Sequence, residues 1–158
     1  MTDGLVEVEG NGQAARRRRS PDPVFHVSAK VDYAVRATAH LAGTDPTRLI
    51  KSDEIAQAED IPIRFLLNIL TELRHARLVR SHRGSDGGYQ LARNPSQITV
   101  ADVVRAIGVG PNGVDRDARP GSLAVWTDAR EAVNEVLEAV TLADVASVRD
   151  PVSALPTP

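Results

Sequence analysis

A stripe of polar side chains recurs along one helix-forming segment of this 158-residue chain. In the helix that we expect over residues 62–76, four polar residues fall at positions i, i+4, i+7 and i+11 of one face: Arg64, Asn68, Thr71 and His75. An arginine, an amide and a hydroxyl on one exposed ridge are groups that hydrogen bond to base edges in the major groove of DNA. An ordinary amphipathic helix would show the same stripe, so the stripe alone does not decide the function.

The segment after this helix has the pattern of a β-hairpin. Residues 78–83 alternate as a strand does, residues 84–88 form a glycine-rich turn, and residues 89–91 resume the alternation. A hairpin that carries Arg80, Arg83 and Arg93 directly after a helix-turn-helix is typical of a wing, whose glycines let the tip approach phosphates and whose arginines neutralise them. The rival interpretation, a nucleotide-phosphate loop, is disfavoured because the terminal Gly-Lys-Ser/Thr is missing and no helix follows.

Two shorter helices are expected to hold the third one in place. Ser28 is a suitable N-cap for a first helix that ends at Gly43, and Ser52 is a suitable N-cap for a short second helix over residues 53–58. Pro62 fits the first turn of the third helix. The apolar side of that third helix is predicted to comprise Phe65, Leu66, Ile69, Leu70, Leu73 and Ala76, with Phe65 as a core anchor.

The second half of the chain predicts a helical extension. Thr99 and Asp102 form a capping-box pattern for a fourth helix, residues 108–121 read as a loop, and a long helix is expected over residues 123–140 with one more capped turn after it. Its apolar stripe needs a partner surface, either a second copy of the chain or the same subunit, and we expect the second copy. The predicted dimerisation residues are Trp126, Ala129, Val133, Val136, Leu137 and Val140.

Composition narrows the class of protein. Aromatic residues are 3% of the chain, so the core must be aliphatic, and no segment has the length or hydrophobicity of a membrane span or a secretion signal, which predicts a cytoplasmic protein. The chain has no cysteine, which excludes thiolate metal sites and a cysteine nucleophile. Between residues 64 and 93, six arginines face only Glu72 and Asp86, although the net charge of the chain is −2. A solvated face could carry the same charge.

The domain organisation follows from these patterns. We expect a mainly α fold with a small β-hairpin wing: a winged helix-turn-helix domain over residues 25–107, the loop at 108–121, and a dimerisation helix with a final helical turn over 122–150. Residues 1–24 and 151–158 are predicted to be disordered tails. The run of four arginines from Arg16 to Arg19 is interpreted either as a DNA-seeking arm or as part of a flexible leader.

Several strings of residues together resemble one bacterial family. They are the opening helix at residues 28–37, the helix-turn-helix from Ile55 to Leu73, the wing run Gly87-Gly88-Tyr89-Gln90-Leu91-Ala92, and the fourth helix at 98–107. The chain is similar over about residues 28–148 to the Rrf-two family of winged-helix transcription regulators. This resemblance implies a homodimer on double-stranded DNA, with the third helix in the major groove of a roughly palindromic operator and the wing in the flanking minor groove.

The resemblance also implies roles for individual residues. Ser28 and Lys30 would meet phosphates, Arg64 and Asn68 would lie toward bases, and residues 83–87 would form the wing tip. The complete predicted DNA-binding set is Ser28, Lys30, Pro62, Arg64, Asn68, Thr71, Arg80, Arg83, Gly84, Ser85 and Gly87.

One departure from the family concerns sensing. Many members hold an iron–sulfur cluster with three cysteines in the loop before the long helix, and this chain has none. We therefore expect no cofactor and no metal, and we expect a regulator, a repressor by analogy, whose effector could be a small molecule or a partner protein. A winged helix that binds protein instead of DNA is the alternative, which the arginine excess disfavours. No nucleophile elbow, metal-ligand spacing or paired carboxylates indicate an enzyme.

Overall fold

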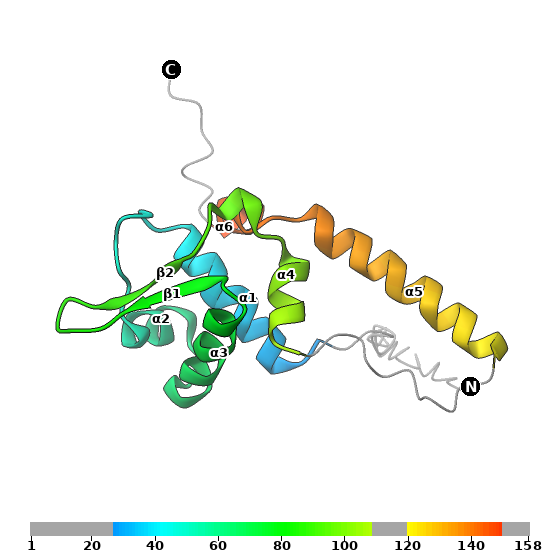
Figure 1. Ribbon diagram of the computed structural model, residues 1–158, viewed down its shortest axis with the longest axis horizontal. Helices are drawn as coiled ribbons and strands as arrows, with labels where there is room; N and C mark the ends of the chain where they lie inside the picture. The colour runs from blue at the N-terminus through cyan, green and yellow to red at the C-terminus, as the bar shows by residue number, and fades with distance from the viewer. Residues whose placement is uncertain (1–26, 109–119, 150–158) are drawn as a thin grey trace, which may run out of the picture.

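The computed structural model describes residues 27–108 and 120–149, and it confirms a mainly helical fold with one hairpin (Figure 1). The expected tails at 1–24 and 151–158, and residues 109–119 of the expected loop, lie outside these ranges. In chain order the elements are α1 (Ala29–Ala42), α2 (Ser52–Glu59), α3 (Ile63–His75), β1 (Val79–His82), β2 (Gly88–Leu91), the 3-10 helix η1 (Pro95–Gln97), α4 (Val100–Ala106), α5 (Pro120–Ala139) and α6 (Leu142–Arg149).

The core is aliphatic, as the low aromatic content predicts. Side chains of α1, α2, α3 and β1 close on one cluster that is shielded almost completely from solvent, and burying this apolar area is the main favourable term in folding. Its largest fully buried members include Ile50, Ile55, Leu66, Ile69, Leu70, Leu73, Val79, Ile98, Val103 and Leu142. The core therefore surrounds α3 on one side and leaves the other side of that helix to solvent.

Three of the predicted N-terminal helix caps are confirmed, at Ser28, at Thr99 and at Thr141, where Thr141 and Asp144 exchange reciprocal hydrogen bonds, and one is wrong. The Ser28 hydroxyl accepts a hydrogen bond from the Val31 amide at 3.4 Å, and Thr99 forms a reciprocal capping box with Asp102. Ser52 is not a cap: it is the first residue of α2, and Lys51 is the N-cap without a side-chain hydrogen bond. Pro62 precedes α3, where its carbonyl accepts from the amides of the first turn.

A buried carboxylate joins α1 to α2. Glu59, at the end of α2, is only 3% exposed. Its Oε1 lies 2.9 Å from Nδ1 of His40, and its Oε2 lies 3.7 Å from Nε of Arg36. A buried charge needs such partners. Because α2 leads directly into the turn at Asp60, this contact fixes where α3 begins.

The hairpin pairs β1 with β2 in antiparallel register, with Val79 opposite Leu91 and His82 opposite Gly88. Ile50 extends the far edge of β2 through a bridge to Tyr89. The turn needs its glycines: Gly84 has a φ of 115°, and a Cβ on Gly87 would lie 2.2 Å from the carbonyl oxygen of His82. These two glycines are therefore required by the turn itself.

Helix α5 leaves the compact part of the molecule and runs beside α4 (Figure 1). Arg105 of α4 donates to Asn134 Oδ1 at 3.0 Å and pairs with Glu138, both on α5. The Arg105 guanidinium, with a smaller effect from Asn134, holds the pKa of Glu138 below its usual value. The helix begins three residues earlier than the expected bound of 123.

The end of the chain differs from the sequence-based prediction. The single capped turn that we grouped with the dimerisation helix over residues 122–150 is an eight-residue helix, α6, which packs against α1 and η1. Leu142 is fully buried in the core of the winged-helix part, and its amide donates to the Ile98 carbonyl at 2.9 Å. The α6 segment was too short for its periodicity to show which surface it covers. Within the described ranges, no helix is long and apolar enough to cross a membrane.

Truncating Leu142 tests this packing. Leu142→Ala should lower the free energy of unfolding by about 2–5 kcal/mol, the usual cost of a cavity at a fully buried leucine. Val148→Ala is the matched control on the same helix, because Val148 is 82% exposed, and its effect should stay within about 0.5 kcal/mol. Urea unfolding monitored by circular dichroism measures both. Equal effects of the two substitutions would contradict the packing of α6 on α1.

Candidate nucleic-acid interface

Helix α3 has one buried side and one side turned to solvent. Leu66, Ile69, Leu70 and Leu73 are buried on the inner side and fix the rotation of the helix about its axis. The predicted polar stripe lies on the opposite side, where all four of its members are exposed: Arg64, Asn68, Thr71 and His75. The structure thus brings together the residues that sequence spacing placed on one face.

Most of this stripe has no partner within the described part of the chain. Arg64, Asn68 and His75 make no side-chain hydrogen bond there, whereas the Thr71 hydroxyl donates to the Leu67 carbonyl at 2.8 Å. Thr71 therefore keeps only its acceptor capacity for a ligand. A guanidinium and an amide without protein partners are available to form bidentate hydrogen bonds to another molecule.

The prediction that Phe65 is a core anchor is wrong. Its side chain is 60% exposed, and Ala76, also assigned to the apolar side, is exposed as the C-cap of α3. Phe65 lies on the flank of α3 that carries Glu72 two turns later, and there α3 is tied to α1 by an ion pair to Lys30. The sequence pattern places Phe65 next to the buried side of α3. Whether another element covers that flank cannot be read from the pattern of one helix. Ile63 and Leu67 are exposed on the other flank, which sequence reasoning missed.

Ser28 and Lys30 hold the start of α1 in place. Lys30 Nζ lies 2.8 Å from Glu72 Oε1 of α3, with both side chains about one third exposed, and Ser28 caps α1. The lysine is therefore partly neutralised before any ligand arrives. Its protein partner reduces the net charge that it offers to a phosphate.

The β1–β2 hairpin is the wing: β1 packs against α3, and the tip extends away from the helices (Figure 1). Arg83, Gly84 and Ser85 are exposed there, next to the half-buried Gly87. Arg80 was predicted with this set, but it lies on β1, three residues before Arg83, and lines a groove next to the end of α3. Pro62 is exposed immediately before α3. The site therefore consists of the α3 stripe and the wing tip, and the groove that Arg80 lines lies between the end of α3 and β1.

This arrangement defines the class of protein. Three helices that present α3 outward, followed directly by a hairpin with an arginine at its tip, form a winged helix-turn-helix, the geometry of DNA-binding transcription regulators. The family model described as "Rrf2: Iron-dependent Transcriptional regulator" matches residues 27–147. The chain belongs to this Rrf2 (Rrf-two) family.

Relatives by sequence are named as regulators of the same type. A Mycobacterium tuberculosis (strain H37Rv) protein that carries the name of an HTH-type transcriptional regulator is 47% identical over 132 residues, covering 77% of this chain and 81% of that protein. The HTH-type transcriptional regulator CymR of Bacillus subtilis (strain 168) is 36% identical over 129 residues, covering 78% and 91%. This chain is thus a DNA-binding transcription regulator by family.

Solved structures agree with the fold. The structure of CymR, the global cysteine regulator of B. subtilis, has a TM-score of 0.68 at 33% identity and covers 78% of this chain and 98% of its own. The structure titled T. potens IscR has a TM-score of 0.70 at 30% identity and covers 85% and 95%. Both likenesses extend through most of this chain.

The residues of this chain do not fit the iron-sulfur cluster that some family members hold. Such a cluster is ligated by cysteine thiolates, and the chain contains no cysteine. Within residues 27–108 and 120–149, no group of three or more His, Asp or Glu side chains is placed to bind a metal ion. Iron chemistry at cysteine ligands therefore enters no step of the function considered below.

The exposure of Phe65 is open to a direct test. Phe65→Ala should change the free energy of unfolding by less than about 1 kcal/mol, because little buried area is lost. Leu66→Ala, at the adjacent and fully buried position, should cost about 2–5 kcal/mol. Thermal or urea unfolding of both variants makes the comparison. A loss at Phe65 as large as that at Leu66 would restore its assignment as a core residue.

Proposed function

We propose that this protein acts as a homodimeric repressor that binds a roughly palindromic operator and does so without an iron–sulfur cluster. The observation that carries the proposal is the exposed stripe of α3, whose Arg64 and Asn68 have no partner among residues 27–108 and 120–149, beside a wing whose tip carries Arg83. In this proposal α3 enters the major groove and the wing tip enters the flanking minor groove. Repression is assigned by analogy with the family.

The roles divide between reading and positioning. Arg64 and Asn68 are the base-reading pair, since arginine recognises guanine and asparagine recognises adenine by paired hydrogen bonds. Ser28, Lys30, Arg83 and Ser85 are proposed to meet the sugar-phosphate backbone, which orients the protein but carries little sequence information. Gly84 and Gly87 contribute by shaping the tip, while Pro62 and Thr71 lie beside the reading pair.

Dimerisation through α5 is supported by an uncovered apolar face. The predicted stripe divides in two: Val133 and Leu137 line a cleft against α4 of the same chain, whereas Trp126 and Val136 are 52% and 65% exposed. Ala129 and the neighbouring Val125 are also exposed, and Val140 is half-buried. Large apolar side chains gathered on one exposed helix face mark an association surface. A second copy related by a two-fold axis would cover it and place two α3 helices on successive half-sites.

The effector is proposed to be a small molecule or a partner protein, because the cluster-based signal of some relatives needs cysteines. The experiment that tests the function is a selection of bound genomic fragments followed by gel-shift titration across salt concentrations. Specific binding that weakens steeply with salt supports a DNA regulator. Absence of binding even at low salt would favour a winged helix that binds protein.

The reading role of Arg64 predicts a loss of discrimination. Arg64→Ala should reduce the preference for the operator over random-sequence DNA by about 1–3 kcal/mol, because one bidentate base contact is removed. Arg48→Ala is the control. Arg48 lies in the loop between α1 and α2, and its guanidinium pairs with Glu54 at 2.8 Å. Competition gel shifts with the two DNAs give the ratio. An equal loss on both DNAs would reassign Arg64 to the backbone.

The dimer proposal predicts a change of mass on substitution. The wild-type protein should be a dimer at micromolar concentration, and Val136→Glu should shift it toward the monomer by placing a carboxylate in the apolar contact. Glu135→Ala, at the neighbouring exposed position, is the control and should remain a dimer. Light scattering coupled to size exclusion measures the mass. A monomeric wild-type protein would contradict the proposal.

A further inference from the structure

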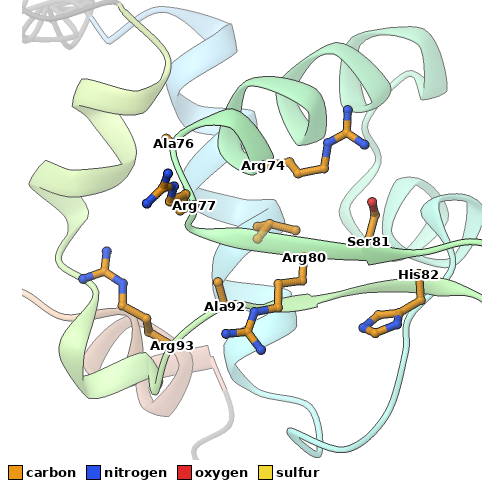
Figure 2. Close-up of a pocket in the computed structure, with 9 residues that line it drawn as sticks. Arg74, Ala76, Arg77, Arg80, Ser81, His82, Ala92 and Arg93 are labelled. Atoms are coloured by element: carbon orange, nitrogen blue, oxygen red, sulfur yellow. The ribbon is translucent and has the colours of Figure 1, made fainter.

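A groove rich in arginine lies between the carboxyl end of α3 and strand β1. Its volume is about 880 Å³. It is lined by residues from the last turn of α3, from β1 and from the segment after β2, and its polar side chains are Arg74, Arg77, Arg80, Ser81, His82 and Arg93 (Figure 2). No acidic side chain is among the lining residues. The groove is therefore a concentration of positive charge.

The four arginines of the groove are not neutralised by any residue that the structure describes. Arg74, Arg77, Arg80 and Arg93 make no ion pair and no side-chain hydrogen bond within the described residues. Elsewhere on the winged-helix part, Arg36, Arg48 and Arg105 each pair with a carboxylate. Four like charges on one surface repel one another and attract anions from solution. The planar guanidinium group binds phosphate oxygens in pairs, which makes phosphate the anion that this lining fits best.

Arg77 occupies a backbone position that usually belongs to glycine. Its φ is 59°, in the left-handed region, directly after the C-cap of α3, and its amide bonds to the Arg74 carbonyl at 3.0 Å. Any residue with a Cβ is strained there, and glycine is the common solution at the end of a helix. Residues held in such backbone regions cluster at binding and active sites. Figure 2 shows the Arg77 side chain among those that line the groove.

The unpaired edge of β1 also bears on which ligand fits the groove. The Ala92 amide donates to the Leu78 carbonyl, so by alternation the amide groups of Val79 and Ser81, two residues that line the groove, point away from β2. An extended acidic peptide could pair with such an edge. However, β1 has only four residues, and charged side chains around a short edge oppose strand addition. A chain of phosphates needs no strand pairing and fits better.

The position of the groove indicates which phosphates reach it. With α3 in the major groove and the wing tip in the adjacent minor groove, a single sugar-phosphate strand separates the two. In that docking, the strand passes between α3 and the hairpin, the two elements that border the groove. We propose that the groove, through Arg77 and Arg80 with Arg74 and Arg93 beside them, binds this stretch of DNA backbone. The inference rests on the proposed function and adds a backbone contact between its two groove contacts.

Arg77→Gly is the decisive substitution, because it removes the guanidinium and relieves the backbone strain at once. The variant should fold, with a melting temperature equal to the wild type or higher. Its affinity for a random-sequence 30-base-pair duplex should fall about fivefold at 0.15 M salt, and the slope of log K against log salt should become shallower by about 0.9, the value for one phosphate contact. Arg77→Gly combined with Arg80→Gln should about double the change in slope.

Arg48→Gln is the matched control and should leave affinity and slope unchanged. Unchanged slopes in Arg77→Gly and in the double variant, with wild-type binding intact, would overturn the groove as a backbone site, which is also the result expected of an acidic-peptide groove. In that case the operator discrimination lost in Arg64→Ala would still support the proposed function. A wild-type protein that binds neither the random duplex nor genomic fragments would overturn both.

Discussion

The burial of one side of α3 is the constraint on which the rest of this structure depends. Leu66, Ile69, Leu70 and Leu73 are in contact with the common core, so the helix cannot rotate without exposing them. The orientation of α3 about its axis determines which of its residues face solvent, and therefore which side chains a ligand can contact. The contacts of Glu59 with His40 and Arg36 place the start of α3, and the Lys30–Glu72 pair fixes its α1-facing flank. The exposed polar stripe of α3 is thus positioned by contacts on the buried side of the helix.

Sequence periodicity predicted the parts of this fold that one element determines by itself. The polar stripe of α3, the caps at Ser28 and Thr99, and the hairpin are all local, and each is set by spacing or turn chemistry along a short stretch. The errors concern contacts between distant segments. Phe65 follows the apolar pattern of its helix, but whether a neighbour covers it depends on where α1 lies. Leu142 lies in a short helix, and only the tertiary structure shows that it enters the core of the first half of the chain.

The arginine groove shows a different limit of sequence reasoning. The excess of arginine between residues 64 and 93 is visible in the sequence, but their convergence depends on the hairpin folding back beside α3. Arg80 lies on β1 and Arg93 lies two residues after β2, and the register of β1 with β2 brings both to the groove that Arg77 also lines. The left-handed backbone of Arg77 is likewise a property of the helix end and not of the residue type. A sequence pattern could have suggested this site only by noting an arginine where a glycine is usual.

The position of α5 concerns how DNA binding is regulated, which is harder to derive from the structure than the DNA-binding surface. Helix α4 contacts α1 and α3 on one side and α5 on the other, with Arg105 bonded to Asn134 and Glu138 across the junction. Within the described residues, α4 thus links the long helix α5 to α3. In relatives that carry a cluster, cysteine ligands precede the long helix, and this chain keeps the helix without them. A change in the placement of α5 can reach α3 through the α4 contacts, or through α6, which follows α5 and packs against α1.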